Sequence, residues 1–307
     1  MKMMINNIIN EIPLFEGKSF YINEQIYHND NFPACFKVNC DGINYKVRFP
    51  SQFNSNSVSS EIEALSILTR HNVSNIPKII SYGKTVNSDV PYLVETFHLG
   101  ESLDKIHKIL TQDDWECISK QLIEFIVSIQ KIRNCKFRTF DTQPNQYENY
   151  GTMLSYRIEK HLLNHESSGL LSNALCKTIR QSLVGIEKNF CHEPIFLHFD
   201  IKPQNIIYNT TNKGVTIIDY EHSRFGDISH EMFRGHIAAK KNLYFYDCWT
   251  SIYNTLATNK AMIITNEKQF FYQIFFYVSE LSYANNIKDK ELISIYEKGL
   301  VSHINNY

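Results

Sequence analysis

Two short polar motifs, each directly after an apolar run, place the strongest constraint on how this chain folds. The first occupies residues 198–205 (HFDIKPQN) and the second residues 217–221 (IIDYE). Between them lie two apolar-rich runs, residues 205–209 and 215–218, separated by a turn-forming segment (TTNKG). This order predicts a β-hairpin that brings Asp219 back beside the loop of Asp200.

The residue types in these motifs indicate a chemistry. Asp200 and Asn205 lie five residues apart, which allows a short loop to point both side chains inward. One carboxylate that orients a hydroxyl, together with an Asn/Asp pair that holds Mg²⁺, makes a phosphoryl-transfer site. The alternative for Asp200 alone is a turn residue after a buried strand, but the second motif at a suitable distance argues against chance.

Composition limits the class of protein. The chain has 307 residues, of which 43% are hydrophobic, enough for two lobes around a cleft with a substantial core. The formal net charge is −1, so nothing favours nucleic acid or an anionic membrane surface as a partner. Seven cysteines, odd in number and without CxxC spacing, indicate reduced thiols and neither a disulfide framework nor a zinc site.

The N-terminal segment, residues 1–10, is apolar but interrupted by asparagines. It lacks the continuous apolar stretch and the cleavage site of a signal peptide. No segment approaches the ~18 uninterrupted apolar residues that a membrane span needs. We therefore expect a cytoplasmic protein with no membrane insertion.

The N-terminal part is predicted to be a small, mainly antiparallel β lobe with one helix. Asp41-Gly42 is a dipeptide typical of the tight turn in a hairpin. Apolar residues at helical spacing then follow from Ile62 to Leu68. The predicted strands cover residues 18–49, 79–83 and 91–95. We place this lobe, with the hinge that ends it, at residues 1–98.

The remainder, residues 99–307, is predicted to be a larger, mainly helical lobe. Apolar residues keep to one helical face from Trp115 to Ile132, and Thr111-x-x-Asp114 is a helix start signal. Residues 135–152 are polar and predict a loop. A second long helix is expected over residues 175–190, and helices rich in aromatic residues are expected after residue 240.

Both motifs resemble those of the aminoglycoside phosphotransferase and choline kinase superfamily, which shares the protein-kinase fold. The family's catalytic loop reads roughly His-x-Asp-x-x-x-x-Asn, met here by His198, Asp200 and Asn205, and the resemblance covers about residues 20–240. It implies a bilobal α+β fold whose first lobe binds the nucleotide. It also implies that Asp200 orients the acceptor hydroxyl and takes its proton, and that His198 braces the loop. Asn205 and Asp219 would bind Mg²⁺.

The residues after Asp219 narrow the resemblance. Asp219-Tyr220-Glu221 is similar to the Asp-aromatic-Glu run of choline kinases. Those kinases carry a further Asp twelve residues beyond the metal ligand, a position held here by Glu231, for which bracing and substrate binding are both open. We take Glu221, Asp227 and Glu231 as candidate residues for the substrate.

A kinase also needs a cation on its third strand to hold the nucleotide phosphates. Lys46 and Arg48 share one strand face, and Arg48-Phe49-Pro50 is the better match to choline kinases. By the resemblance, Glu61 is the ion-pair partner of Arg48. The alternative is that Ser60-x-x-Glu63 is a capping box, so pairing by Glu61 requires the helix to begin a turn earlier, near Ser57.

The resemblance places the hinge at residues 95–98, where the backbone of Glu95 and Phe97 would meet adenine. Residues 28–32 occupy the place of the phosphate-binding loop without its glycines. Lys202 either contacts the transferred phosphate, as in protein kinases, or is a surface lysine. The aromatic residues between Phe270 and Tyr277 could line a pocket for a quaternary ammonium group, but helical spacing favours core packing.

These features predict an ATP- and Mg²⁺-dependent kinase, with GTP also possible, that phosphorylates a hydroxyl of a small molecule. Choline, ethanolamine or another amino alcohol leads, and an aminoglycoside or a sugar follows. A protein serine/threonine kinase is the first alternative, although no Ala-Pro-Glu motif follows Asp219. A catalytically dead kinase fold that only binds is the second, although every acidic and amide group that catalysis needs is present.

Overall fold

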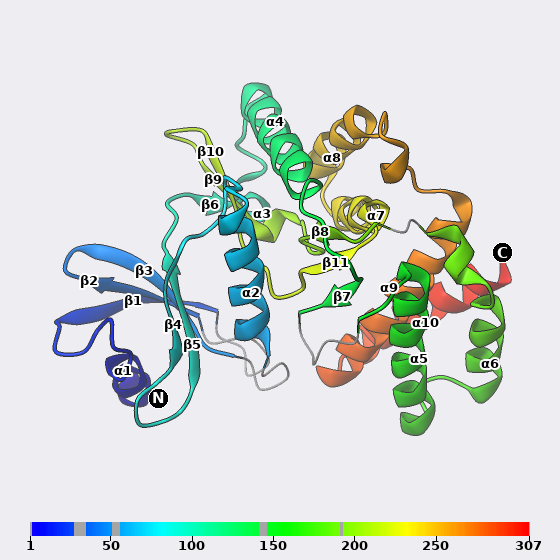
Figure 1. Cartoon of the computed structure of the whole chain (residues 1–307), viewed down its shortest axis with the longest axis horizontal. Coiled ribbons are helices and arrows are strands. Elements are labelled where there is room, and N and C mark those ends of the chain that lie inside the picture. The colour runs from blue at the N-terminus through cyan, green and yellow to red at the C-terminus, as the bar shows by residue number, and fades with distance from the viewer. Residues whose placement is uncertain (1, 28–34, 51–55, 141–145, 191–192, 307) are drawn as a thin grey trace.

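The computed structural model describes residues 2–306 except 28–34, 51–55, 141–145 and 191–192. In the described part of the chain, the N-terminal region forms an antiparallel five-stranded sheet of order β1-β2-β3-β5-β4 (Figure 1). The strands are β1 (Phe20–Tyr27), β2 (Cys35–Cys40), β3 (Ile43–Arg48), β4 (Ile79–Lys84) and β5 (Pro91–Thr96). Helix α1 (Lys2–Asn10) packs against this sheet.

The predicted hairpin at Asp41-Gly42 is confirmed. Asp41 and Gly42 connect β2 to β3 with φ of +55° and +79°, the left-handed region that two-residue hairpin turns require. The pairing then places Arg48 opposite Cys35 on β2. On the other side of β3, Lys46 lies opposite Glu95 of β5. The register therefore sets the depth of both candidate cations in the sheet.

Helix α2 (Ser57–Arg70) lies beside the sheet and begins where pairing by Glu61 requires. Its N-cap is Asn56, so Ser60 lies inside the first turns and the capping box with Glu63 is not formed. Glu61 is on the buried face of the helix, together with Ala64 and Leu65. The helix therefore carries a carboxylate into the interior.

The C-terminal part is mostly helical and carries two small three-stranded sheets in the described chain, β10-β9-β6 and β7-β11-β8. The helices are α3 (Leu103–Ile106), α4 (Gln112–Ile129), α5 (Tyr150–Ser168), α6 (Asn173–Ser182), α7 (Ile228–Ala239), α8 (Leu243–Leu256), α9 (Asn266–Asn286) and α10 (Lys290–Asn305). The strands are β6 (Glu101–Ser102), β7 (Arg138–Thr139), β8 (Ile195–Leu197), β9 (Ile206–Asn209), β10 (Gly214–Ile217) and β11 (Arg224–Gly226).

Helix boundaries follow local signals in one case and differ from prediction in two. Thr111 and Asp114 form a complete capping box at the start of α4, as predicted. The single helix expected over 175–190 is wrong: α6 ends at Ser182, and Gly185, with φ of +77°, separates it from a 3-10 turn (Ile186–Asn189, η1). The predicted loop 135–152 contains β7 and the first turn of α5.

Among the residues that the structure describes, the buried apolar ones form two clusters. The smaller one joins α1 to the N-terminal sheet, for example through Ile9, Phe15 and Val38. The larger one runs from α2 and Leu93 of β5 through the helical part. Since α2 belongs to the larger cluster, apolar packing holds it against the helical part as well as the sheet. The aromatic residues at 270–277 are mostly core, as helical spacing favoured.

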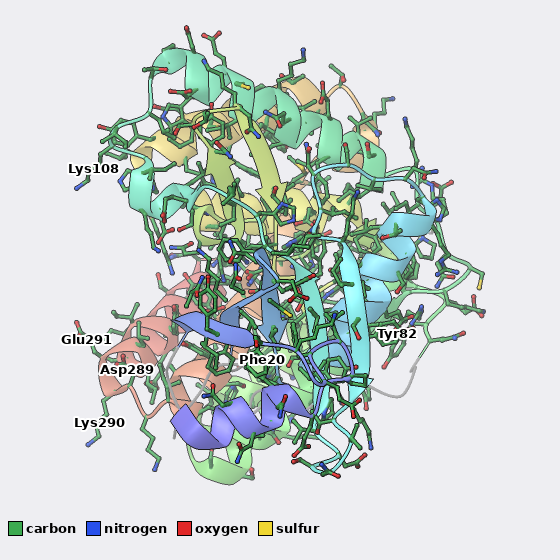
Figure 2. The ribbon with its side chains drawn as sticks, turned by 90° about the vertical axis from the view of Figure 1, so that its left-hand side faces the viewer. Phe20, Tyr82, Lys108, Asp289, Lys290 and Glu291 are labelled. Atoms are coloured by element: carbon green, nitrogen blue, oxygen red, sulfur yellow. The ribbon has the colours of Figure 1, made fainter. Side chains whose placement is uncertain are left out.

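Figure 2 views the molecule from the side of the N-terminal sheet, with Phe20 of β1 and Tyr82 of β4 labelled. Asp289, Lys290 and Glu291, at the start of α10, lie at the surface in this view. Asp289 caps α10 through its side chain. Among the described residues, no helix combines the length and the apolar character that a membrane span requires.

Candidate active site

The loop after β8 holds Asp200 and Asn205 in direct contact. Asn205 lies in the 3-10 turn Pro203–Asn205 (η2), and both side chains are buried. Asn205 Nδ2 donates to the backbone oxygen of Asp200 at 3.0 Å and to Asp200 Oδ2 at 2.9 Å. Because the amide nitrogen makes both bonds, the amide oxygen is the atom of Asn205 that remains to bind a cation.

His198 is a buried link between this loop and the following hairpin. Its Nε2 donates to the backbone oxygen of Ile218 at 3.0 Å, and its Nδ1 accepts from the backbone nitrogen of Asp200 at 3.2 Å. Burial lowers the pKa of His198, so the ring is neutral in the tautomer that these two bonds require. The geometry is that of a bracing residue.

Glu231 of α7 (Ile228–Ala239) holds the same loop through a hydrogen bond. Its Oε2 accepts from the backbone nitrogen of Phe199 at 2.7 Å, and its side chain is fully buried on α7. Phe199 has φ of +69°, an uncommon conformation for a residue of this size, and this bond helps to hold it. Of the two roles left open for Glu231, the structure supports bracing; its burial argues against contact with a substrate.

Asp200 lies among positive charges. Lys202 Nζ is 2.7 Å from Asp200 Oδ2, and Arg234 Nη2 is 3.5 Å from Oδ1. Burial alone would raise the pKa of Asp200, but these cations and His222 hold it below its ordinary value. Burial opposes the charge of Lys202, yet the carboxylates of Asp200 and Asp219 raise its pKa. Both groups are therefore ionised near neutral pH.

The predicted hairpin brings Asp219 back to the loop. Strands β9 and β10 pair antiparallel, with Ile206 opposite Ile217. The next residue, Ile218, donates its backbone N–H to the backbone oxygen of Asn205 at 2.9 Å. Asp219 follows with φ of +70°, a bend that turns its carboxylate out of the strand direction. Asn205 and Asp219 thus meet at the end of the hairpin.

Arg48 connects the N-terminal sheet to this point. Its guanidinium forms an ion pair with the fully buried Glu61. It also donates to Asp219 Oδ1 at 2.8 Å and to Glu221 Oε2 at 2.6 Å. Burial alone would raise the pKa of Asp219, but the nearby positive charges, Arg48 foremost, lower it. The structure therefore contains the expected pairing of Arg48 with Glu61, and adds two further carboxylates to it.

Lys46 makes a separate ion pair on the same strand. Its Nζ lies 3.0 Å from Oε2 of Glu95, which is fully buried on β5. Burial alone would lower the pKa of Lys46, but the carboxylates of Glu95 and Glu61 raise it by more than burial lowers it. The ammonium therefore stays charged. Lys46 and Arg48 are thus both held by acids, and only Arg48 reaches Asp219.

The predicted hinge is the segment that leaves β5. Phe97 is half-buried, with Lys37 Nζ 4.5 Å from the centre of its ring. His98 lies within 3.1 Å of Thr216 Oγ1 on β10 and so ties the hinge to the catalytic hairpin. Gly100 has φ of +127°, and a Cβ there would be 2.5 Å from the backbone oxygen of Tyr208. Only glycine allows the chain to pass so close to β9. Residues 28–32, proposed to lie over the phosphates, are outside the described residues.

The other substrate candidates have different environments. Glu221 is partly buried beside Arg48, and burial with the nearby charge of Asp219 raises its pKa. Asp227 is fully buried: it caps α7 by accepting from the backbone of Ser229 and binds Lys268 Nζ at 2.8 Å. Asp227 therefore stabilises the packing of α7 on α9, and this environment favours a structural role over the predicted contact with a substrate.

One residue of the site had no sequence motif of its own. Arg234 lies on α7, three residues after Glu231, and contacts Asp200 from the helical side. The i, i+3 spacing from a predicted site residue on one helix was the available signal. Only the fold could show that this helix face meets the catalytic loop.

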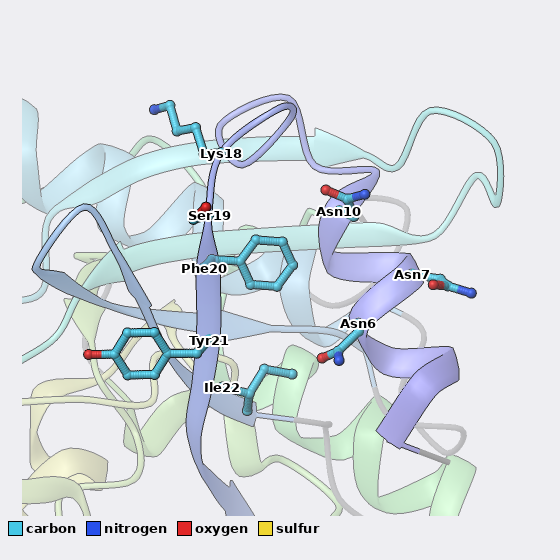
Figure 3. Close-up of a pocket in the computed structure, with 8 residues that line it drawn as sticks. All are labelled: Asn6, Asn7, Asn10, Lys18, Ser19, Phe20, Tyr21 and Ile22. Atoms are coloured by element: carbon cyan, nitrogen blue, oxygen red, sulfur yellow. The ribbon is translucent and has the colours of Figure 1, made fainter.

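A pocket of about 520 Å³ lies between α1 and β1 (Figure 3) and is lined by residues from Asn6 to Ile22, well before the candidate site residues in the sequence. Phe20 and Ile22 of β1 point toward α1 across it, and Asn6, Asn7 and Asn10 line it from the helix. Its lining contains no residue of the loop 198–205, of the β9–β10 hairpin or of the ion pairs of Arg48 and Lys46. Because its walls carry no converging charged groups, we assign it no chemistry.

Comparison with known proteins fits this geometry. Residues 31–238 match the model of a family described as the phosphotransferase enzyme family, APH. The chain belongs to this family. The protein is thus a phosphotransferase of the kinase type, and its α+β architecture is that of the family. The curated proteins contain no match to its sequence.

Solved structures of similar fold include aminoglycoside phosphotransferases and a putative fructosamine-3-kinase. The phosphotransferase matches aminoglycoside phosphotransferase APH(4)-Ia with a TM-score of 0.73 at 12% identity, covering 99% of each chain. It matches a putative fructosamine-3-kinase from Haemophilus somnus 129PT with a TM-score of 0.69 at 15% identity, covering 97% of this chain and 96% of that one. The GDP and kanamycin complex of APH(2")-IIia matches with a TM-score of 0.66 at 16% identity over 99% of each chain. At these identities the likeness shows the shared fold.

Proposed function

We propose that this phosphotransferase moves the γ-phosphoryl group of ATP to a hydroxyl of a small molecule, with Mg²⁺ and with Asp200 as the catalytic carboxylate. The observation that carries the proposal is that one place receives Asp200, Asn205, Asp219 and the Arg48–Glu61 ion pair from separate segments. Each segment alone is explained by a structural role, but together they supply the groups that phosphoryl transfer requires.

Asp200 would act on the acceptor. Its ionised carboxylate would orient the hydroxyl and accept its proton as the hydroxyl oxygen bonds to the γ-phosphorus and the bond to the β,γ-bridging oxygen breaks. Lys202, protonated and 2.7 Å from Asp200, would stabilise the transferred group. His198 and Glu231 would hold the loop, and would not take part in the reaction.

Asn205 and Asp219 would hold Mg²⁺. Oxygen ligands suit this ion, which commonly takes one or two protein ligands and completes its shell with phosphate oxygens and water. Because so few protein ligands are needed, the site does not depend on a cluster of three or more His, Cys, Asp or Glu, and the described residues contain no such cluster that could hold a metal. When bound, the ion would neutralise charge on the β- and γ-phosphates.

Charge supports the same assignment. The Arg48 cluster joins two cations, Lys46 and Arg48, to four carboxylates: Glu61, Glu95, Asp219 and Glu221. This leaves two unbalanced negative charges if all six groups are ionised, and one if Glu221, whose pKa is raised, holds a proton; either surplus would attract a divalent cation. Arg48 would then exchange part of its contact with Asp219 for the nucleotide phosphates.

Residues 1–98 would form the nucleotide-binding lobe and residues 99–307 the lobe with the catalytic loop and the acceptor. Within the first, Arg48 paired with Glu61 would hold the phosphates, with Lys46 as the alternative cation, and the backbone of Glu95 and Phe97 would meet the base. ATP is our first choice and GTP the second, since relatives were crystallised with ADP, with AMP-PNP and with GDP.

Three acceptor classes remain. The Asp219-Tyr220-Glu221 run supports an amino alcohol of the choline or ethanolamine kind. Hygromycin B and kanamycin, bound in two relatives, support an aminoglycoside. The fructosamine-3-kinase likeness supports a sugar derivative.

A coupled assay of ADP release across these three classes and a generic protein acceptor would test the proposal. We expect turnover with at least one small molecule, dependence on Mg²⁺, and its loss in Asp200→Ala. Turnover only with the protein acceptor would support a protein kinase instead. Tight Mg·ATP binding with no turnover on any acceptor would support a catalytically dead binding protein.

A further inference from the structure

Arg234 occupies a position beside the catalytic carboxylate that the proposed reaction does not use. It projects from α7, with Nη2 3.5 Å from Asp200 Oδ1 and Nη1 3.8 Å from Glu280 Oε1 of α9. Its guanidinium therefore spans the gap between the catalytic loop and α9. The side chain is 18% exposed, so part of it can be reached from outside.

The donors of Arg234 are largely unused. At these distances it makes ion pairs, but among the described residues it donates no hydrogen bond to either carboxylate. Its guanidinium also lies near two aromatic rings, 5.3 Å from the centre of Phe199 and 5.9 Å from that of Phe276. Arginine has five N–H donors in a planar fork that fits two oxygens of one acid. A fork held in place by rings, with donors to spare, suits an anionic ligand.

Arg234 is on the acceptor side of Asp200. Lys202 and Asn205 contact Oδ2, the oxygen nearer the metal ligands, and the charge of Asp219 acts on Lys202. Arg234 contacts the opposite oxygen and reaches toward α9, away from the N-terminal sheet. A group bound to Arg234 would thus belong to the molecule whose hydroxyl meets Asp200. This step rests on the proposed function.

Charged groups of both signs lie near Arg234. Arg224 of β11 lies 3.5 Å over the ring of Phe199, and Arg157 of α5 lies 6.0 Å from the ring of Phe275. The acids that pair with Arg234 are Asp200 and Glu280, both at the long end of ion-pair distance. An acidic group that approaches the guanidinium would meet an opposite charge, whereas the ammonium of an amino alcohol or an aminoglycoside would meet a like charge.

We propose that Arg234 recognises an acidic group, a carboxylate or a phosphate monoester, on the hydroxylated small molecule that this phosphotransferase phosphorylates. Arg234 is then a specificity residue: its fork binds the acid while Asp200 takes the proton of a hydroxyl on the same molecule. Of the three acceptor classes, the sugar class fits, in the form of a sugar acid or sugar phosphate.

The test uses acceptors that share a carbon skeleton and differ in charge. Gluconate, sorbitol and glucamine form one series, and glycerate, glycerol and 2-amino-1,3-propanediol form a second. Glucose 6-phosphate and glycerol 3-phosphate distinguish a phosphate from a carboxylate as the acid. Binding to the full-length protein is measured by calorimetry, both alone and with Mg·AMP-PNP, and turnover is measured by ADP release.

We expect the acids of each series to bind about 10- to 100-fold more tightly than the matched neutral and cationic compounds, as for a charge-assisted pair. Arg234→Gln should remove this preference, and Arg234→Lys should retain part of it. The matched control is Arg133→Gln, which removes a cation in a similarly loose ion pair, 3.5 Å from Glu193, away from the site. This variant should keep the preference.

No preference for acids, a preference for the amines, or a preference that survives in Arg234→Gln would each overturn the inference. An equal fall in kcat on every acceptor in Arg234→Gln would also overturn it, because it would assign Arg234 to the transferred phosphoryl group. Turnover of a neutral or cationic acceptor in preference to its matched acid, dependent on Asp200, would contradict the inference and leave the proposed function intact. Because acid binding is also measured without nucleotide, a failure of Mg·nucleotide binding would be recognised separately.

Discussion

The catalytic loop and the Arg48 cluster meet at Asp219 but are held by different forces. The loop is held by short hydrogen bonds among buried groups: His198 donates to Ile218, Phe199 donates to Glu231, and Asn205 donates to Asp200. The Arg48 cluster rests on ion pairs among side chains from β3, α2 and the end of the hairpin. The first arrangement fixes positions, whereas the second can exchange partners.

This difference suggests a division of labour. Hydrogen bonds among buried side chains and the backbone of the loop keep Asp200 in position without reorganisation, which is what catalysis by positioning needs. Ion pairs with surplus negative charge can instead be rearranged when phosphates and a metal arrive. Changes to the loop should therefore affect the chemical step, and changes to the cluster should affect the nucleotide.

The largest expected effect is that of Asp200→Ala on turnover. Removing the proposed general base should lower kcat by about 10²–10⁴-fold. The dissociation constant for Mg·ATP should stay nearly unchanged, because Asn205 keeps its bond to the backbone oxygen of residue 200 and Arg48 contacts Asp219 independently of Asp200. Steady-state kinetics and calorimetry measure the two quantities. A variant that kept more than about a tenth of the wild-type kcat would show that Asp200 is misassigned.

A smaller effect, on nucleotide binding, is expected from changes to the two cations of β3, Arg48 and Lys46. Arg48→Ala should raise the KM for nucleotide and lower kcat, by about 10- to 100-fold in kcat/KM, because a charge-assisted contact to the phosphates is lost. Arg48→Lys should recover part of this activity, since a two-donor fork becomes a point charge.

Lys46→Ala is the matched control for this comparison, because Lys46 also pairs with a fully buried glutamate but does not reach Asp219. Its effect on the KM for nucleotide should be much smaller. A greater loss in Lys46→Ala than in Arg48→Ala would show that the phosphates are held two residues earlier on β3.

The smallest effect concerns stability and pH. Burial raises the pKa of Glu231 to about 7 from the ordinary 4.5, so the folded state binds this proton more tightly than the unfolded state. The resulting stabilisation is complete below about pH 4.5 and is lost as the pH rises to about 7. By linkage it amounts to at most about 3 kcal/mol.

Glu231→Gln keeps an oxygen that can accept from Phe199 but does not titrate. Its free energy of unfolding, from urea titrations at several pH values, should therefore depend less on pH between 5 and 7 than that of the wild type. The same pH dependence in both proteins would contradict the assigned burial of a titrating Glu231.

Those parts of the fold that depend on local signals were predictable from the sequence. The Asp41-Gly42 turn, the Thr111–Asp114 capping box and the hairpin before Asp219 each depend on neighbouring residues, and all three are present. The kinase-like architecture followed from the spacing of the two motifs and the family resemblance. The break at Gly185 was missed because helical spacing continues across a single glycine whose left-handed backbone the pattern does not reveal.

The candidate site was predictable where a single sequence motif contains its residues. It was not predictable where burial determines the role of a side chain. Asp227 and Glu231 are acids in a promising position of the sequence, but Lys268 of α9 and the backbone of Phe199 engage them in the interior. Arg234 reaches Asp200 only through the packing of α7 on the loop. These contacts join residues far apart in the chain, so no local sequence pattern predicts them.

A magnesium titration of nucleotide binding tests the central claim most directly. Calorimetry would compare the affinity for AMP-PNP in the wild type, Asp200→Ala and Asp219→Asn as the Mg²⁺ concentration rises. We predict that Mg²⁺ strengthens binding in the wild type and in Asp200→Ala but has little effect in Asp219→Asn, which lacks an anionic oxygen ligand. An unchanged Mg²⁺ dependence in Asp219→Asn would contradict the account, because the metal would then lie elsewhere.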